Sequence, residues 1–210
     1  AHAIRVVLTG ASGQLADLRV GAFRGGNTMI RVGTSNDVIA VRGSIKFAFN
    51  RELREWRDRT VVDADATNVR AISIVNDLGT YAFERNASDE WVQSAGQAPI
   101  ERFSGQKVET LVAALAHLRA NDFAADGATT GLATPSSTVT LTVRTGGGEG
   151  DAGVAATTEQ IVLLMGGTAE GTDVYVQRQG NPLVYTVAAY AGGRLRPELS
   201  AFQTDPPSDA

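Results

Sequence analysis

The chain has 210 residues, of which 43% are hydrophobic and 20% charged, and its formal net charge is −4. This composition is typical of a globular chain with a sizeable core, and the acidic balance gives no reason to expect nucleic acid or an anionic membrane as partner. The absence of cysteine excludes disulfides, cysteine nucleophiles and thiolate metal sites.

The first 58 residues predict four short strands and a closing helix. Apolar and polar side chains alternate over residues 4–9, 15–20, 28–32 and 38–41, with "GASGQ" and "GTSND" as turns. Ser44 is the expected N-cap of the helix. The apolar face of that helix comprises Ile45, Phe49, Leu53 and Trp56. Residues 42–59 are locally basic, but acidic residues alternate with the basic ones, as on a solvated helix face.

The middle of the chain predicts three strands, a longer helix and a loop. The strands are "VRAISIV", "TYAFER" and "EWVQS", separated by the turn residues 76–79 and 86–89. The helix is expected over Ser104–Ala120. Its buried stripe comprises Val108, Leu111, Val112, Leu115 and Leu118. The composition of "AADGATTGLATPSS" indicates a loop or linker.

The pattern of the first 58 residues then returns. Residues 21–57 align without a gap on residues 167–203, so that Gly21 meets Gly167 and Trp56 meets Phe202. Upstream, "IRVVLT" corresponds to "VTLTVR" and "LADLRVG" to "EQIVLLMG". We therefore predict an α+β fold of antiparallel β-meanders, each closed by a helix, with an internal repeat in B-A-B order. An A half has three strands and a helix, and a B half has four strands and a helix.

This repeat predicts the domain organisation. Residues 1–58 form the C-terminal B half of a first repeat, and residues 59–123 form the N-terminal A half of a second. Residues 124–137 are the linker loop, residues 138–203 the second B half, and residues 204–210 a disordered tail. The first B half has no A half in front of it, so we expect the chain to be a fragment of a longer protein.

One glycine-rich turn invites a nucleotide-binding interpretation. "LTGASGQLA" resembles the turn of short-chain dehydrogenase-like proteins, with Thr9, Gly10 and Gly13 matching and Ala16 at the last glycine position. That interpretation needs a helix after the turn, whereas the following residues alternate as a strand. The later copy of this turn, "TGGGEGDAG", keeps neither the length nor the residues of the first. We therefore expect a hairpin turn here.

Other candidate sites are equally incomplete. "DADATN", Asp63–Asn68, looks like the start of a calcium loop, but Asn68 replaces the glycine and Ile74 the bidentate glutamate, so we expect a turn before a strand. "GGGEGDAG" resembles a calcium-binding nonapeptide repeat but occurs once, and is expected to be a hairpin loop. The two histidines, His2 and His117, are expected at the frayed start and on a solvent-facing helix surface, too few for a hydrolytic triad or a histidine-based metal site.

The aromatic residues leave one alternative open. Core packing is favoured for Trp56, because an aromatic residue matches it in the second copy. Trp91 could equally line a binding surface, together with the four tyrosines Tyr81, Tyr175, Tyr185 and Tyr190. Nothing in the sequence singles out a pair among the acidic residues. The sequence therefore predicts no catalytic, cofactor-binding or metal-binding residues, and no cofactor.

An ordered series of short motifs resembles a known family. The series is "REWRDRTVVDADATNVRAISI", "YAFER", "EWVQ", "VETLVAALAHLRA", "GLATP" before "STVTLTV", and "VYVQRQGNPLVYTV" followed by a helix. Together these motifs are similar to the bacterial domain of unknown function 4340, in tandem form with the first copy truncated. The resemblance implies an extracytoplasmic domain, held by a membrane helix outside this chain, in proteins often encoded beside ABC-type transporters of the gliding-motility kind. No catalytic residues are known for that family, so none are carried over.

We therefore expect a non-catalytic structural or interaction module of a membrane-anchored bacterial protein, accessory to an ABC-type transporter or gliding-motility-like complex. Its expected partner is a protein, with transporter subunits as candidates, and neither nucleic acid nor direct membrane insertion is expected. The alternative is a ligand-binding domain for a peptide, glycan or lipid head group, in a cleft between the A half and a B half. A nucleotide-dependent oxidoreductase is a remote third possibility. The oligomeric state stays open.

Overall fold

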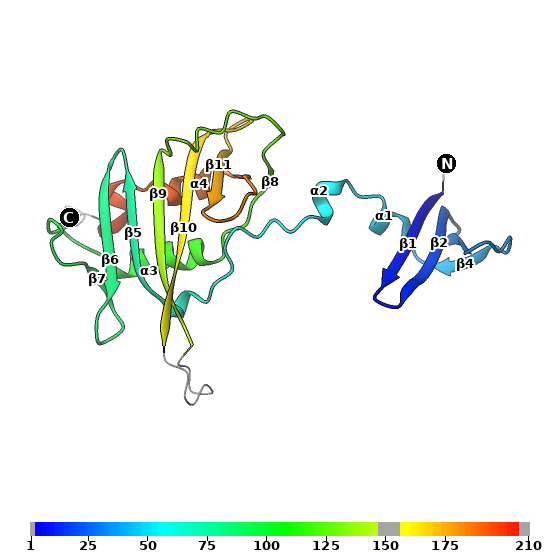
Figure 1. Cartoon of the computed structure of the whole chain (residues 1–210), viewed down its shortest axis with the longest axis horizontal. Coiled ribbons are helices and arrows are strands. Elements are labelled where there is room, and N and C mark those ends of the chain that lie inside the picture. The colour runs from blue at the N-terminus through cyan, green and yellow to red at the C-terminus, as the bar shows by residue number, and fades with distance from the viewer. Residues whose placement is uncertain (1–2, 147–155, 206–210) are drawn as a thin grey trace, which may run out of the picture. The chain divides into compact units, whose positions relative to one another are not determined.

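The structure is a computed structural model that describes residues 3–146 and 156–205 (Figure 1). The chain divides into two compact units, Ala1–Arg57 (unit 1) and Asp58–Ala210 (unit 2). Both units are built of antiparallel strands with short helices, as an α+β fold requires.

Unit 1 is a four-stranded antiparallel meander followed by two helical turns. Its sheet order is β1-β2-β3-β4, so consecutive strands are neighbours and β1 and β4 are the edges. The bounds are β1 Ile4–Gly10, β2 Gly13–Arg24, β3 Asn27–Val32 and β4 Ile39–Arg42. These four strands confirm the prediction, with β2 longer at both ends. The residues after the glycine-rich turn thus belong to a strand, and there is no helix N-terminus here to face a pyrophosphate.

The closing helix of unit 1 differs from the prediction. Two single turns, α1 (Lys46–Phe49) and α2 (Leu53–Trp56), replace one continuous helix. The expected cap at Ser44 is also wrong, because the N-cap of α1 is Ile45, with no side-chain cap hydrogen bond. The chain leaves the helical conformation at Asn50 (φ −92°, ψ 60°), and Glu52 starts a new turn through a capping box with Glu55.

Unit 1 has a very small core. Among its described residues only Val20 and Thr28 are buried. The Thr28 hydroxyl donates to the carbonyl oxygen of Gly43 (2.6 Å) and accepts from the backbone N–H of Ile45 (3.2 Å), so it ties β3 to the start of α1. The predicted core packing of Trp56 is wrong, since 59% of this residue is exposed.

Unit 2 contains one eight-stranded antiparallel sheet in the order β7-β6-β5-β9-β10-β11-β12-β8. The strands of the first part are β5 Val69–Asn76, β6 Gly79–Arg85, β7 Trp91–Gln93 and β8 Asp122–Phe123. The later strands are β9 Ser137–Thr145, β10 Thr157–Thr168, β11 Val174–Arg178 and β12 Tyr185–Val187. The helical segments are η1 Ala66–Asn68, α3 Gly105–Ala116, α4 Ala189–Leu195 and η2 Leu199–Phe202. The predicted strands of the middle part are confirmed, and β5 joins them to the later meander by pairing with β9.

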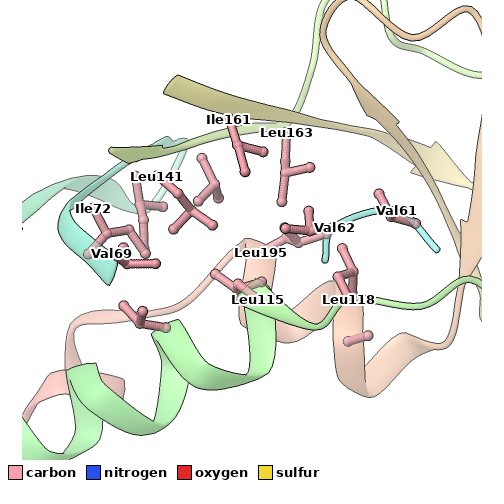
Figure 2. Packing of buried hydrophobic residues seen from close by; sticks show 14 of the residues in the cluster. Val61, Val62, Val69, Ile72, Leu115, Leu118, Leu141, Ile161, Leu163 and Leu195 are labelled. Atoms are coloured by element: carbon pink, nitrogen blue, oxygen red, sulfur yellow. The ribbon is translucent and has the colours of Figure 1, made fainter. Parts of the chain in front are cut away.

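The core of unit 2 lies between this sheet and its helices. Apolar side chains alternate with polar ones along β9, so one face of the strand is buried and carries Val139, Leu141 and Val143. Figure 2 shows strand side chains such as Leu141 and Leu163 meeting Leu115 of α3 and Leu195 of α4. The two parts of unit 2 therefore share one continuous core and one continuous sheet.

The helix α3 ends earlier than predicted. Ser104 caps it as expected, by accepting from the backbone N–H of Lys107, but the last helical residue is Ala116 instead of Ala120. The next residues form backbone hydrogen bonds with an extended segment instead: the Leu118 carbonyl oxygen accepts from the N–H of Val61 (2.9 Å). The predicted stripe still faces the core, with Leu111 half-buried and its other four members buried.

The loop after β8 is docked on the sheet. The N–H of Gly167 donates to the carbonyl oxygen of Thr130 (2.9 Å), and the N–H of Ser136 donates to that of Met165 (2.8 Å). The contact is close enough that a Cβ atom on Gly166 would lie 2.0 Å from the Thr130 oxygen. The loop thus packs against β10 at its irregularity between Met165 and Thr168.

Candidate functional site

The edge strand β7 presents unpaired backbone groups. It lies beside β6 at one end of the sheet (Figure 1), and no strand of the described chain pairs with its other side. The register of the β6–β7 pair places Asn86 opposite Glu90 and Ala82 opposite Ser94. The N–H of Asn86 donates to the carbonyl oxygen of Glu90, and the N–H of Ser94 to that of Ala82. Because bonded and non-bonded pairs alternate along an antiparallel ladder, the N–H and C=O groups of Trp91 and Gln93 point away from β6.

A tight turn at residues 86–90 precedes β7. The side-chain oxygen of Asn86 accepts from the N–H groups of Ser88 and Glu90, both at 2.9 Å. Asp89 takes the left-handed conformation, with φ of 63°. Its carboxylate forms an ion pair with Arg70 of β5 (2.5 Å). This turn fixes where β7 starts and leaves Glu90 exposed beside it.

Behind the edge lies a cluster of Arg85, Trp91 and Glu109. The guanidinium of Arg85 lies over the Trp91 ring, 4.8 Å from its centroid, and donates to Glu109 Oε2 (2.7 Å). The indole N–H of Trp91 donates to the same oxygen (2.7 Å). The side chain of Arg85 is nearly buried and also donates to the carbonyl oxygens of Val69 and Asp89. These groups satisfy one another and hold β6, β7 and α3 together, which settles the open question about Trp91 in favour of a buried ring.

An open groove of about 520 Å³ runs along this edge. One wall is the turn and edge strand, residues 89–93, and the other is formed by Phe103 and the first turns of α3, including Gln106 and Glu109. Gly105 allows the close approach of the two walls, since a Cβ atom there would lie 2.7 Å from the carbonyl oxygen of Trp91. That carbonyl is therefore covered, while the N–H of Trp91 and both backbone groups of Gln93 face the groove side.

The chemistry of the groove is that of backbone hydrogen bonding beside acidic side chains. Within residues 3–146 and 156–205, no three His, Asp or Glu side chains come together as metal ligands, and no buried side-chain polar atom lacks a partner. The shifted titratable groups lie elsewhere and have local causes. Hydrogen bonds from Thr67 lower the pKa of Asp65, those from Thr60 lower the pKa of Asp58, and Arg196 lowers the pKa of Asp77.

The structure gives the earlier candidates structural roles where it describes them. Asp65 of "DADATN" accepts from the N–H of Thr67 (2.9 Å) and caps η1, so this segment is the expected turn into β5. His117 is exposed as predicted, with Nδ1 3.6 Å from Asp63 Oδ1. His2, the "GGGEGDAG" segment and the end of the tail lie outside the described residues. In the described part of the tail, the N–H of Thr204 donates to the carbonyl oxygen of Arg102 (2.8 Å).

The tyrosines do not gather at the groove. Tyr81 and Tyr185 are buried in the core, Tyr175 is half-buried on β11 and Tyr190 is exposed on α4. Arg85 and Glu109, which organise the groove, were not among the predicted site residues. Each is an ordinary charged residue in the sequence, and only the fold brings the end of β6 to the second turn of α3.

Comparison with known proteins gives a family but no annotated relative. The family model described as a domain of unknown function (DUF4340) matches residues 2–135, which include all strands of unit 1 and the segment from β5 to β8 of unit 2. The comparisons with curated proteins and with solved structures gave no match. In the described part of the chain no helix is long and apolar enough to cross a membrane. Since the match covers more than half of the chain, the protein belongs to the DUF4340 family.

Proposed function

We propose that the chain is a non-catalytic interaction module that binds an extended segment of a protein partner along the β7 edge. The observation that carries this proposal is the groove itself, where the N–H of Trp91 and the two backbone groups of Gln93 point away from β6 beside α3. An extended peptide that adds to a sheet edge gains main-chain hydrogen bonds, and a neighbouring helix supplies contacts for its side chains. Edge strands that proteins leave uncovered are natural sites for such pairing.

The side chains around the groove define the segment it would take. Asp89, Glu90 and Glu109 line it. Asp89 is paired with Arg70, and Glu109 with Arg85, so the exposed Glu90 is the acid that is open to a basic residue of a partner. The groove therefore favours an extended segment that carries a basic residue near the Glu90 end of β7. Phe103 offers an apolar contact further along.

We test this proposal with a library of displayed random peptides selected on the chain. Gln106→Trp places a bulky ring in the groove, and Thr110→Trp, also at an exposed position of α3 but outside the groove, is the matched control. We expect selected peptides to be rich in basic residues and to bind the control as tightly as the parent chain. Gln106→Trp should weaken them at least tenfold. Peptides that bind all three proteins equally, or no enrichment at all, would refute the proposal.

A small-ligand site is the second candidate function. The volume of the groove, about 520 Å³, falls in the range of small-molecule pockets. The junction between the A half and the second B half is closed by the β5–β9 pairing, so such a ligand would bind to the A half alone. A thermal-shift screen with peptides, glycans and lipid head groups distinguishes the two candidate functions. If a glycan or lipid head group stabilises the chain and Gln106→Trp abolishes that stabilisation, the result favours a small-ligand site over a peptide-binding edge.

The tandem repeat in B-A-B order is also part of the proposal. The strand registers support it. β3–β4 pairs Thr28 with Val41, and β11–β12 pairs Val174 with Val187, which are the same positions at the offset of 146 found in the sequence. The sheet irregularity after Val20 in β2 corresponds to the one after Met165 in β10 at an offset of 145, one less than in the strands that follow. An experimental structure in which β1–β4 did not superimpose on β9–β12 would refute the repeat.

The cellular context rests on the family. We propose that the module works outside the cytoplasm, in a membrane-anchored protein accessory to an ABC-type transporter or gliding-motility-like complex. Membership of the DUF4340 family supports this context. The test is fractionation of the native host followed by purification of the whole protein from membranes. Recovery in the cytosolic fraction, or from membranes without any transporter subunit, would count against the context and leave the groove proposal standing.

A further inference from the structure

Three apolar positions that are exposed in unit 1 correspond to buried positions in unit 2. The offset of 146 matches Trp56 with Phe202 and Ile39 with Tyr185. The exposed fractions are 59% against 0% and 49% against 2%. The exposed fractions differ although β3 pairs with β4 in the same register as β11 pairs with β12: Ile39 lies opposite Ile30, and Tyr185 opposite Val176.

The third position is on the first strand of each meander. Val20 pairs with Ile4 in unit 1, and its counterpart Met165 pairs with Ser137 in unit 2. These pairs align Ile4 with Ser137, two residues away from the alignment of the sequence motifs. In this structural alignment Leu8 of β1, which is 49% exposed, corresponds to Leu141 of β9, which is 0% exposed. A strand that is central in unit 2 is thus an edge strand in unit 1.

Residues of the A half lie against each of the three positions of unit 2. Leu141 lies opposite Ile72 of β5, and β5 pairs with β9 from Asn76↔Ser137 to Val69↔Val143. The ring of Phe202 is 4.9 Å from that of Tyr81 and 4.7 Å from that of Phe83, both on β6. The ring of Tyr185 is 5.4 Å from that of Phe123 on β8.

We infer that the apolar face of unit 1 and the free edge of β1 bind a further A half, that is, a three-stranded antiparallel polypeptide unit with its helix. Its first strand pairs antiparallel with β1 as β5 pairs with β9, and its second strand brings aromatic rings onto Trp56. This inference rests on the proposed repeat. It identifies a second docking surface, distinct from the β7 groove, and one class of occupant.

The arrangement excludes a simple exchange between two copies of the chain. The A half of each copy is already covered by its own second B half, through the core that the two share. If that A half moved to unit 1 of another copy, one B half would be uncovered for each one covered. The occupant is therefore an additional A half and not the one present in this chain.

The test supplies such an A half. A second copy of residues 58–136 is joined in front of Ile4, so that Ser136 directly precedes the start of β1 as it directly precedes β9 in the parent chain. Trp91→Phe in both copies leaves Trp56 as the only tryptophan, because the chain has two. We expect the emission of Trp56 to shift to the blue and its quenching by iodide to fall. We also expect the amides of Val6–Leu8 to exchange about 100-fold more slowly.

The matched control carries Tyr81→Asp and Phe83→Asp in the added copy only. It has the same length and should leave Trp56 as exposed as in the parent. If the added copy folds and Trp56 stays exposed, the inference is wrong. A blue shift of Trp56 in the parent chain with vesicles of phosphatidylglycerol, and none with the added A half, would assign the face to lipid and also overturn it. Neither result bears on the β7 groove. Neither result bears on the repeat, which superposition of the two meanders tests separately.

Discussion

Replacing Phe202 and Trp56 by alanine compares two positions that correspond in the proposed repeat. Phe202 is fully buried and contacts the rings of Tyr81 and Phe83, whereas Trp56 is mostly exposed. Removing a buried phenylalanine from a core costs about 3–5 kcal/mol, and two lost ring contacts place the value in the upper half of that range. An exposed side chain with few neighbours costs about 0.5 kcal/mol or less.

The assay is guanidinium unfolding followed separately in the two units. Trp56→Phe leaves Trp91 as the sole tryptophan of the chain and a reporter of unit 2. With an m-value of about 4 kcal/mol/M, Phe202→Ala lowers the midpoint by about 1 M. Hydrogen exchange of unit 1 peptides reports Trp56→Ala, for which we expect no change beyond about twofold. A midpoint unchanged by Phe202→Ala, or a large loss of protection caused by Trp56→Ala, would refute the reasoning.

Three further substitutions test single contacts of unit 2. Gly166→Ala places a methyl group 2.0 Å from the Thr130 carbonyl oxygen, and we expect it to cost about 3 kcal/mol in thermal unfolding. Glu109→Gln leaves the nearly buried guanidinium of Arg85 with Asp89, at 3.6 Å, as its remaining anionic partner, and we expect a cost of about 1–3 kcal/mol together with weaker binding of groove peptides. The Asp77 carboxylate, whose pKa is lowered by hydrogen bonds from Arg196 (2.7 Å for Nε), stabilises the fold above the pKa of the unfolded chain. That contribution is lost as pH falls through the lower folded pKa, so Asp77→Asn should flatten the acid limb of a stability–pH profile.

Two of these substitutions have a matched control. Gly193→Ala, in α4 with no atom within 4 Å of the added methyl group, should be neutral or slightly stabilising. Thr110→Trp should leave peptide binding unchanged. If Gly166→Ala and Gly193→Ala had equal effects, the loop would not be docked against Gly166. If Glu109→Gln were as stable as the parent chain, the cluster of Arg85, Trp91 and Glu109 would not stabilise the fold. If Asp77→Asn left the acid limb of the profile unchanged, the ion pair of Asp77 with Arg196 would not contribute to stability.

The strands were predictable because their signal is local. Alternation marks β1 to β7 with small errors at the ends, and turns that begin with asparagine, such as Asn76–Gly79, fix the hairpins of the middle part. The helix ends were not predictable to the same degree. Both α1 and α3 stop where another interaction competes for the backbone: the Glu52 capping box in unit 1, and the pairing of Leu118 with Val61 in unit 2.

The candidate site depends on contacts that the sequence does not encode locally. Arg85 and Glu109 are separated by a strand, a loop and a helix start, and their shared partner Trp91 could have been on the surface or in the core. The prediction that Trp56 packs in the core was wrong for a related reason. The apolar pattern of residues 44–56 does not reveal whether another part of a protein covers Trp56. Phe202, its counterpart in the proposed repeat, is buried against Tyr81 and Phe83.

The account depends most on the claim that unit 1 is an open counterpart of the closed meander in unit 2. Native-state hydrogen exchange measures this directly by comparing the amides of Val6–Leu8 in β1 with those of Val139–Leu141 in β9. We predict that the β9 amides are among the slowest in the described chain and exchange at least about 100-fold more slowly than those of β1. Equal protection of the two strands would contradict the claim.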